Sequence, residues 1–328
     1  MSNPNDLMKL ALELAGKGQG WVSPNPMVGA IIIKNGKIIG QGFHEKYGEN
    51  HAEINALNSC KASPKNASIF VTLEPCCHFG KTPPCTHAII ESGIEKVFIG
   101  LKDPSEKISG KGIDELKKAG IKVFSGFLEN EIREQNIHFF TFHEKKRPFI
   151  SLKVAFSQDG KISRDKSEKT PITSEVANIF THKLRHDHQA ILVGAGTVIS
   201  DNPHLGVRLI KGRDPLRIIL SGLREIPKKS QIFRNENFLI FHNKTIVEIL
   251  GALYEKNVIS LLIEGGQEVF SSFINAKCID KLYLISSPIK LGESAYPFLK
   301  KNIKLSFSQE NVQQLGKDHL IVATPKWD

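Results

Sequence analysis

The sequence predicts two α/β domains, because helical and strand patterns alternate along both halves of the chain. The chain has 328 residues. That length exceeds one ordinary hydrophobic core and suits two domains of about 150 residues each. A charged run, His143–Arg147, ends at Pro148, directly before a new apolar segment. We therefore place the domains at residues 1–146 and 147–328, the first as a three-layer α/β domain.

The first half contains one helix, one hairpin and then a β-α-β-α-β succession. Apolar residues over 7–14 have the spacing of an amphipathic helix, which we expect to end near Gly16. Asn35-Gly36 separates two apolar runs, and this dipeptide is a strong signal for a hairpin. The predicted strands are 28–33, 38–43, 68–73, 97–100 and one around Val123, and the predicted helices are 51–57, 83–90 and 113–118.

The second half repeats the alternation without an internal repeat of the first half. A strand over 149–156 follows the charged run. The helices predicted after it are 174–184, 246–255 and 267–274, and the strands are 190–193, 216–220, 238–242, 260–264, 282–286 and 320–323.

Composition excludes several classes of protein. No apolar stretch is long enough to cross a membrane, and the first residues do not have the pattern of a signal peptide. Five cysteines are too few and odd in number for a disulfide framework, so we expect a cytoplasmic protein in which the clustered cysteines bind metal. The net charge is +10, but the lysines are scattered along the chain. We therefore expect phosphorylated small molecules as partners, and neither nucleic acid nor membrane.

The most informative pattern is a set of metal-binding residue types within one short α/β stretch. His51 precedes Glu53 by two residues, and Glu74-Pro75-Cys76 is followed by Cys85. One imidazole and two thiolates are a donor set that zinc prefers, with a fourth position left for water. The glutamate is placed to move a proton to and from that water. Zinc deaminases carry the pattern H-x-E followed by P-C and a second cysteine.

Two other interpretations of this pattern stay open. A structural zinc site would need a fourth protein ligand, which Cys77 or His78 would have to supply. A nucleic-acid deaminase would agree with the positive net charge, but eight residues separate Cys76 from Cys85 where the short pattern has two.

The longer spacing has a counterpart in a known family. The segments Ser23–Gly29, His51–Glu53 and Thr72–Cys85, the last ending in Gly-Lys-Thr-Pro-Pro-Cys, resemble the deaminase half of the bifunctional riboflavin-biosynthesis deaminase–reductases. The resemblance implies that His51, Cys76 and Cys85 bind zinc and that Glu53 is the catalytic proton shuttle. It also implies a set of contacts to the pyrimidine substrate: Asn25, His44, His78, Lys81 and Thr82.

The second half contains two glycine-containing turns after predicted strands. Gly194-Ala195-Gly196 lacks the third glycine of a dinucleotide fingerprint and is weak evidence. Glu264-Gly265-Gly266 lies between a strand and a helix, where small residues let a phosphate approach the helix start. With Ser151–Lys161, Leu184-Arg185 and Ala190–Val198, these turns resemble the reductase half of the same family. That half is similar to dihydrofolate reductase and uses NADPH.

The resemblance implies two groups of site residues in the reductase half. The NADPH site would contain Ala155, Pro171, Thr173, Thr197, Asp201, Ser221, Gly266, Gln267, Glu268, Val269, Phe270, Ser271 and Ser272. The ribosyl-phosphate substrate would be contacted by Lys153, Lys169, Arg185, Leu205, Arg208 and Glu264.

The chain departs from the family pattern at Pro171, at Gly206 and over Ile289–Glu293. The resemblance still predicts a bifunctional enzyme, a zinc-dependent deaminase and NADPH-dependent reductase, that forms a dimer or tetramer. A deaminase with a degenerate reductase domain is the alternative, and the residues alone do not distinguish NADPH from NADH.

Overall fold

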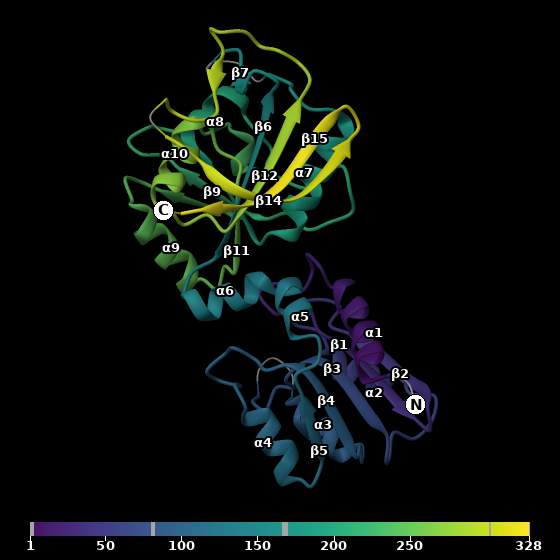
Figure 1. Ribbon diagram of the computed structural model, residues 1–328. Helices are drawn as coiled ribbons and strands as arrows, with labels where there is room; N and C mark the ends of the chain where they lie inside the picture. Colours follow the sequence, from purple (N-terminus) through teal and green to yellow (C-terminus); the bar gives the residue numbers. More distant parts are fainter. Residues whose placement is uncertain (1–2, 80–82, 166–169, 302, 328) are drawn as a thin grey trace. The chain divides into compact units, whose positions relative to one another are not determined.

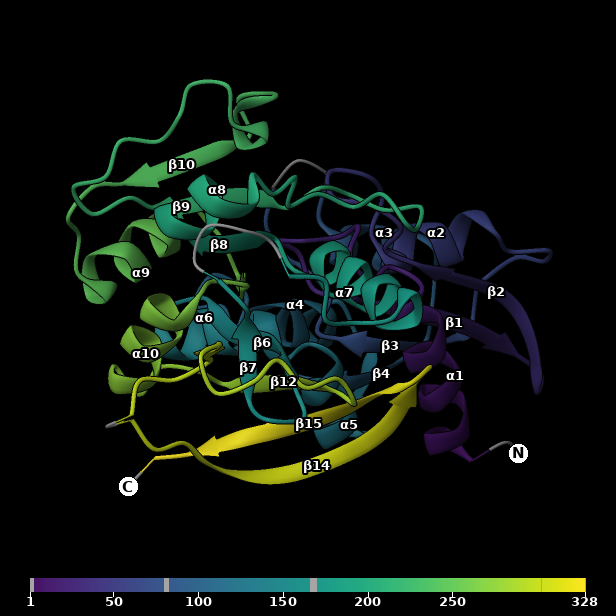
Figure 2. The same cartoon turned by 90° about the horizontal axis from the view of Figure 1, so that it is seen from above.

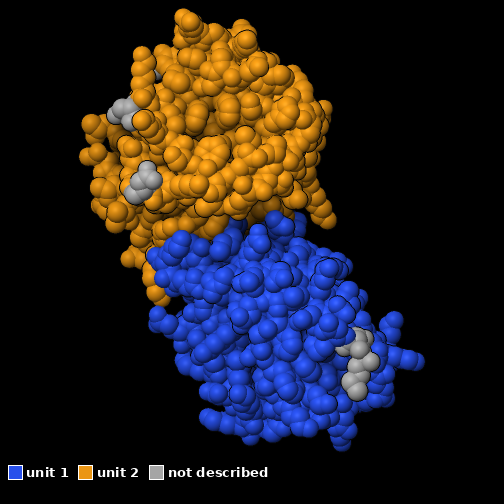
Figure 3. Space-filling view, in the orientation of Figure 1, with its two compact units in different colours: residues 1–145 blue, residues 146–328 orange. Residues whose placement is uncertain are grey.

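The computed structural model describes residues 3–79, 83–165, 170–301 and 303–327. The chain divides into two compact units, Met1–Lys145 and Lys146–Asp328 (Figure 3). Each unit has its own sheet and its own buried apolar clusters. Of the helices in the described ranges, none is long and apolar enough to cross a membrane.

The sheet of the first unit has five strands in the order β2-β1-β3-β4-β5 (Figure 1). β1 runs antiparallel to β2 and β3, whereas β3, β4 and β5 are parallel. The predicted hairpin is confirmed: Asn35 and Gly36 have φ of 50° and 75°, as a two-residue turn between twisted strands requires. The strands are β1 (Gly29–Lys34), β2 (Lys37–Phe43), β3 (Ser68–Leu73), β4 (Lys96–Leu101) and β5 (Lys122–Ser125).

Helices cover both faces of this sheet, because alternate side chains of its buried strands are apolar on both sides. Ile32 and Ile69 face one helical layer, whereas their neighbours Ile31 and Phe70 face the other. The first layer contains α2 (Ala52–Asn58), α3 (Cys85–Glu91) and α4 (Lys111–Lys118). The second contains α1 (Pro4–Gly16), α5 (Glu129–Gln135) and α6 (Ile137–Lys145), of which the sequence predicted only the first. The three-layer prediction is therefore confirmed.

The sheet of the second unit has eight strands in the order β10-β9-β8-β11-β6-β12-β15-β14. Neighbours from β10 to β12 are parallel, and β15 and β14 continue the sheet antiparallel. The strands are β6 (Phe149–Ser157), β8 (Ala190–Gly194), β9 (Leu216–Leu220), β10 (Phe238–Phe241), β11 (Ser260–Ile263), β12 (Lys281–Ser287), β14 (Ser306–Leu315) and β15 (Asp318–Lys326). Two short strands, β7 (Lys161–Ser163) and β13 (Tyr296–Pro297), pair separately.

This sheet also lies between two helical layers (Figure 2). α9 (Ile246–Glu255) and α10 (Gln267–Asn275) pack on the face that carries Leu261 and Ile263. α7 (Glu175–Asp187) and α8 (Ala195–Asp201) pack on the face that carries Leu262. A short 3₁₀ turn, η1 (Gln231–Phe233), precedes β10.

Parallel strands place their carboxyl ends at one edge of the sheet, where α/β proteins bind ligands. At this edge α8 follows β8, Ser221 follows β9, and Glu264 with α10 follows β11. Residues that are distant in sequence are therefore brought together by the sheet topology.

Candidate functional site

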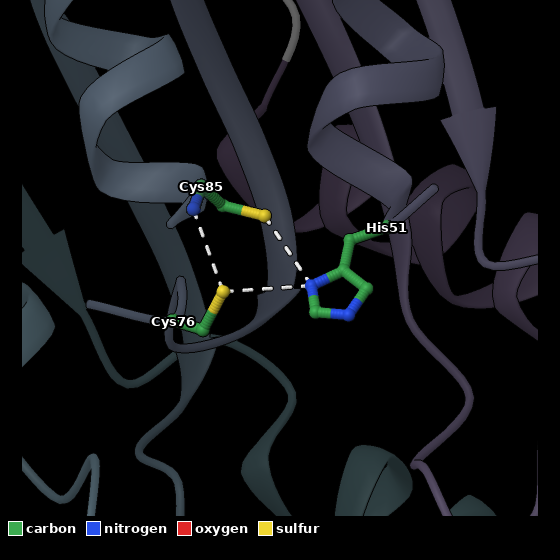
Figure 4. Close-up of side chains that lie close together, drawn as sticks. All are labelled: His51, Cys76 and Cys85. Atoms are coloured by element: carbon green, nitrogen blue, oxygen red, sulfur yellow. Dashed lines mark hydrogen bonds between the residues drawn. The ribbon is translucent and has the colours of Figure 1, made fainter. Parts of the chain in front are cut away.

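His51, Cys76 and Cys85 form one cluster in the first unit (Figure 4). His51 is the residue before α2, Cys85 is the first residue of α3, and Cys76 lies in the segment after β3. The His51 Nδ1 atom lies 3.5 Å from Cys76 Sγ and 3.4 Å from Cys85 Sγ. All three ligand atoms lie within 4.8 Å of one another. The predicted N, S, S donor set is thus assembled as zinc requires.

The electrostatic surroundings favour a thiolate in this cluster. Hydrogen bonds from Cys85 and from His51 lower the pKa of Cys76 to about 4, although burial opposes the shift. The backbone N–H of Cys85, at the start of α3, also donates to Cys76 Sγ at 3.4 Å. A helix start and a neighbouring imidazole both stabilise the anionic sulfur that binds metals.

The cluster contains no fourth histidine, cysteine or carboxylate from the described residues. A structural zinc site usually has four protein ligands, whereas a catalytic site keeps one position open. Of the two proposed fourth ligands, Cys77 is half-buried and His78 is exposed, and neither belongs to the cluster. The geometry favours the catalytic interpretation.

Glu53 lies in the first turn of α2 with only 3% of its surface exposed. Burial raises the pKa of Glu53 to about 7, against the opposing effect of His51. A carboxyl group with a pKa near 7 exchanges a proton readily at neutral pH, which is the property of a general acid–base.

Two predicted substrate contacts lie beside the cluster. The His44 ring lies edge-on to the His51 ring, with the centroids 5.2 Å apart. Its Nε2 lies 3.1 Å from Asn25 Nδ2, and its Nδ1 lies 3.0 Å from the Asn50 carbonyl. Burial lowers the pKa of His44, which favours the neutral form of the ring.

The loop that carries Asn25 is held by a residue that the sequence analysis did not identify. Asn136, after α5, accepts from the Met27 N–H at 2.7 Å and donates to the Met27 carbonyl at 3.0 Å. Asn136 is buried and lies 109 positions along the chain from Met27. No local pattern could have predicted this pairing.

Of the remaining predicted contacts, only His78 lies among the described residues, and it is not brought to the cluster. In the described part of the chain His78 forms no hydrogen bond to the three metal-ligand residues, and its side chain is exposed. Lys81 and Thr82 lie outside the described residues, as does Lys169 of the second unit.

The sequence predicted no contact for Glu74, which precedes Pro75-Cys76. In the structure it binds the backbone around the start of α4. Its carboxylate accepts hydrogen bonds from four backbone amides, at distances of 2.9 to 3.3 Å: Asp103, Gly110, Gly112 and Ile113. The last three surround the start of α4, so this buried carboxylate caps that helix. Beside it Asp103 is also buried, and burial raises its pKa to about 7.

In the second unit, three predicted substrate residues form one buried charge cluster. Arg185 on α7 donates two hydrogen bonds to Glu264, at 2.7 and 2.9 Å. The Lys153 ammonium on β6 lies 3.8 Å from the same carboxylate. Burial alone would raise the pKa of Glu264, but Arg185 and Lys153 hold it at about 2. Burial lowers the pKa of Lys153.

Two further predicted substrate residues, Leu205 and Arg208, lie in the segment between α8 and β9. Leu205 is buried with φ of 55° and packs on α7 and β8. Arg208 is exposed, and within the described ranges its guanidinium has no carboxylate partner. At Gly206, where the sequence departs from the expected pattern, a Cβ would lie 2.7 Å from the side chains of Asp214 and Arg234.

Several predicted cofactor residues meet at the carboxyl edge of the sheet. A Cβ built on Gly266 would lie 3.6 Å from Thr197 Oγ1, so α8 and the start of α10 are adjacent. Ser221 Oγ lies 2.8 Å from His242 Nδ1, and Asp201 accepts from Ser200 at 2.6 Å. Ala155 and Thr173 are half-buried.

The remaining members of the set are distributed differently. Gln267 donates to the carbonyls of Pro297 and Leu299, each at 3.1 Å, while Pro171 is exposed. The exposed Glu268 pairs with Lys300, and the exposed Ser272 bonds to the Glu268 carbonyl. Three residues of α10 face the interior: Val269, Phe270 and Ser271. The departure at Ile289–Glu293 has a local role, because the Leu291 and Gly292 amides donate to Asp159.

Comparisons with known proteins find a family match in each half of the chain. Residues 1–101 match the cytidine and deoxycytidylate deaminase zinc-binding region. Residues 148–321 match the RibD C-terminal domain. The predicted fold class, a cytidine-deaminase-like domain followed by an α/β reductase domain of this family, is therefore confirmed.

Relatives match along nearly the whole chain. The riboflavin biosynthesis protein RibD of Bacillus amyloliquefaciens is 38% identical, over 97% of this chain and 95% of its own length. The solved structure of Acinetobacter baumannii RibD has a TM-score of 0.94 at 31% identity and covers 99% of both chains.

The name of a second protein of solved structure states both of its activities. The Thermotoga maritima diaminohydroxyphosphoribosylaminopyrimidine deaminase/5-amino-6-(5-phosphoribosylamino)uracil reductase is 38% identical, with a TM-score of 0.89, over 98% of this chain and 99% of its own. Since both family regions and relatives of this identity span the chain, it belongs to the RibD family of riboflavin biosynthesis proteins and is a bifunctional deaminase and reductase.

Proposed function

We propose that residues 1–146 are a zinc-dependent pyrimidine deaminase domain and that residues 147–328 are an NADPH-dependent reductase domain. We also propose the substrates for which the Thermotoga protein is named, diaminohydroxyphosphoribosylaminopyrimidine and then 5-amino-6-(5-phosphoribosylamino)uracil. The observation that carries the proposal is the cluster of His51, Cys76 and Cys85. The buried Glu53 lies in the first turn of the helix that follows His51.

In the deaminase domain the three ligands would hold zinc, which when bound activates a water for attack on the ring carbon. Glu53 would accept a proton from that water and return it to the amine, which leaves as ammonia. Its pKa of about 7 allows both transfers at neutral pH. His44 and Asn25, which lie together beside His51, would orient the pyrimidine.

In the reductase domain NADPH would supply a hydride to the opened ribose, giving the ribityl alcohol. Arg208, whose guanidinium has no carboxylate partner among the described residues, would bind the substrate phosphate. Lys153 would donate to the sugar oxygen that gains negative charge, while Glu264, itself bound by Arg185, holds the Lys153 ammonium in place. Asp201 is a further candidate for handling the proton.

The preference for NADPH over NADH comes from the family alone. Initial rates with each cofactor, on the same preparation, measure this preference directly. A dimer or tetramer and a cytoplasmic location remain predictions, and light scattering after size exclusion measures the first.

Zinc removal tests the central part of the proposal. Dialysis against a chelator should abolish ammonia release and leave reduction of 5-amino-6-(5-phosphoribosylamino)uracil unchanged. A Cys85→Ser variant should lose both zinc and ammonia release, while the Cys77→Ser control, at a half-buried position outside the cluster, should retain both. Full ammonia release from zinc-free protein would contradict the proposal.

A further inference from the structure

We propose that His182 is a positioning residue of the reductase, whose ring fixes the segment that presents Arg208 to the substrate phosphate. The inference rests on the proposed role of Arg208 in binding phosphate. His182 itself is placed to act on the backbone of this segment and not on the substrate.

The segment in question, residues 202–215, joins α8 to β9 without forming a helix or strand. Backbone N–H groups outside regular structure need other acceptors. Four side chains supply them here, and the first is His204, whose Nδ1 accepts from the Gly206 N–H at 3.2 Å. Asp214 Oδ1 accepts from the Val207 N–H at 2.7 Å, and two histidines of α7 accept from three further amides.

His182 accepts hydrogen bonds from the backbone amides of Arg208 and of the residue after it. Its Nδ1 accepts from the Arg208 N–H at 2.8 Å and from the Leu209 N–H at 3.4 Å. Because a backbone N–H only donates, Nδ1 must carry a lone pair and the ring proton must be on Nε2. Burial, together with the charges of Arg185 and Arg208, lowers the pKa of His182 to about 4, which keeps this lone pair available at neutral pH.

A second contact one helical turn later fixes the far part of the segment. His186 Nδ1 accepts from the Arg213 N–H at 3.0 Å. The adjacent Gly212 allows this approach, because a Cβ there would lie 2.9 Å from His186 Nδ1. Two histidines at i and i+4 on one face of α7 therefore hold the segment on both sides of Ile210 and Lys211.

The same helix carries Arg185, which donates to the Gly206 carbonyl at 3.3 Å as well as to Glu264. The backbone of Arg208 is consequently fixed relative to the buried charge cluster at the substrate site. Loss of the His182 acceptor leaves two amides without a partner, and the segment can then move Arg208 away from the phosphate.

Three substitutions at His182 distinguish the effect of losing the hydrogen-bond acceptor from the effect of losing the ring's volume. His182→Asn keeps an acceptor at the position of Nδ1, His182→Gln moves it one bond further out, and His182→Leu removes it. We expect the Leu and Gln variants to raise the KM for 5-amino-6-(5-phosphoribosylamino)uracil by about tenfold, as loss of a buried acceptor implies. The KM for NADPH and kcat should stay within about twofold, and the Asn variant should restore the KM.

The proposal is overturned if the Gln variant has the wild-type KM, or if the Asn and Gln variants raise it equally. The Gln variant decides the matter if the Leu variant fails to fold. His319→Gln, on an exposed position of β15, is the control for histidine loss. Arg208→Ala is measured alongside: an unchanged KM there refutes the phosphate role and this inference together. A raised KM for Arg208→Ala beside wild-type values for all His182 variants refutes the inference alone.

Discussion

A buried cluster of three charged side chains lies in the second unit. The side chain of Glu264 is 9% exposed and is neutralised by Arg185 and Lys153, each with a side chain 13% exposed. Removing one partner from a buried ion pair leaves an uncompensated charge, which costs far more than the pair itself contributes. The cluster therefore links stability to the substrate site.

Replacing Arg185 by Met should lower the free energy of unfolding of the reductase unit by about 3–5 kcal/mol. Lys244→Met is the matched control, because its pair with Glu248 is about half exposed, at 51% and 47%. That control should cost less than about 1 kcal/mol. Hydrogen exchange of peptides from β8 and β11 in denaturant reports on this unit alone. Equal losses for the two variants would contradict the account.

His188 makes the stability of the second unit depend on pH. It is fully buried, between the Leu184 carbonyl and Ser151 Oγ, each 2.7 Å from a ring nitrogen. Burial lowers its pKa from 6.5 to about 4. The folded chain therefore binds this proton less readily than the unfolded chain. The associated stability is present above pH 6.5 and is lost as the pH falls toward 4.

Protonation of His188 should lower the free energy of unfolding by about 3 kcal/mol between pH 6.5 and pH 4. His188→Gln should unfold at lower denaturant concentration at pH 7 and show a smaller decrease between pH 6.5 and pH 4.5. His182 and Glu264 still contribute acid sensitivity in both proteins. An unchanged pH dependence in the variant would contradict the assignment to His188.

At the scale of elements, the Glu74 carboxylate connects the start of α4 to the segment that carries Cys76. The residue before α4, Gly110, has φ of 87° and no side chain to cap the helix. Glu74 supplies the cap from two residues before Cys76. Gly112 permits the approach, since a Cβ there would lie 2.2 Å from the Pro75 carbonyl oxygen. The helix start thus fixes the backbone that presents Cys76.

Glu74→Gln places an amide donor against backbone donors and should weaken zinc binding by about 10–100-fold, as loss of an outer-shell partner does. Competition with a chromophoric chelator measures this affinity. Glu91→Gln, at the exposed end of α3, is the control and should bind zinc normally. Zinc affinity that is unchanged in Glu74→Gln would show that the cap does not position Cys76.

Elements with a clear local pattern were predicted, and those defined by tertiary pairing were not. The hairpin turn and the buried strands are determined by short-range chemistry. β14, by contrast, is mostly polar and exposed, and it is a strand only because it pairs with β15. α5 and α6 lie in a stretch whose charged end resembled a linker, although Phe139 and Phe140 pack against the sheet.

The same distinction applies to the sites. The clustering of His51, Cys76 and Cys85 could be predicted because few residue types bind zinc, so their spacing alone is informative. Asn136, Asp103 and His182 act through contacts to residues far along the chain. Their types are common in any sequence, and only the fold shows what they contact.

At the scale of the whole molecule, each unit contains its own core and its own site. Loss of the proton shuttle in the first unit should therefore leave the chemistry of the second intact. Glu53 is not a member of the metal cluster, so Glu53→Gln should keep its zinc. Deamination should fall by about 10²–10⁴-fold, the contribution of a general acid–base.

The most direct test follows NADPH oxidation and ammonia release together, starting from diaminohydroxyphosphoribosylaminopyrimidine. We predict that the wild-type protein oxidises one NADPH for each ammonia released. With this substrate, Glu53→Gln should slow both reactions by the same factor of about 10²–10⁴, yet it should oxidise NADPH normally when given 5-amino-6-(5-phosphoribosylamino)uracil. NADPH oxidation at the wild-type rate by Glu53→Gln from the diamino substrate, or ammonia release by wild type without NADPH oxidation, would contradict two successive steps on one chain.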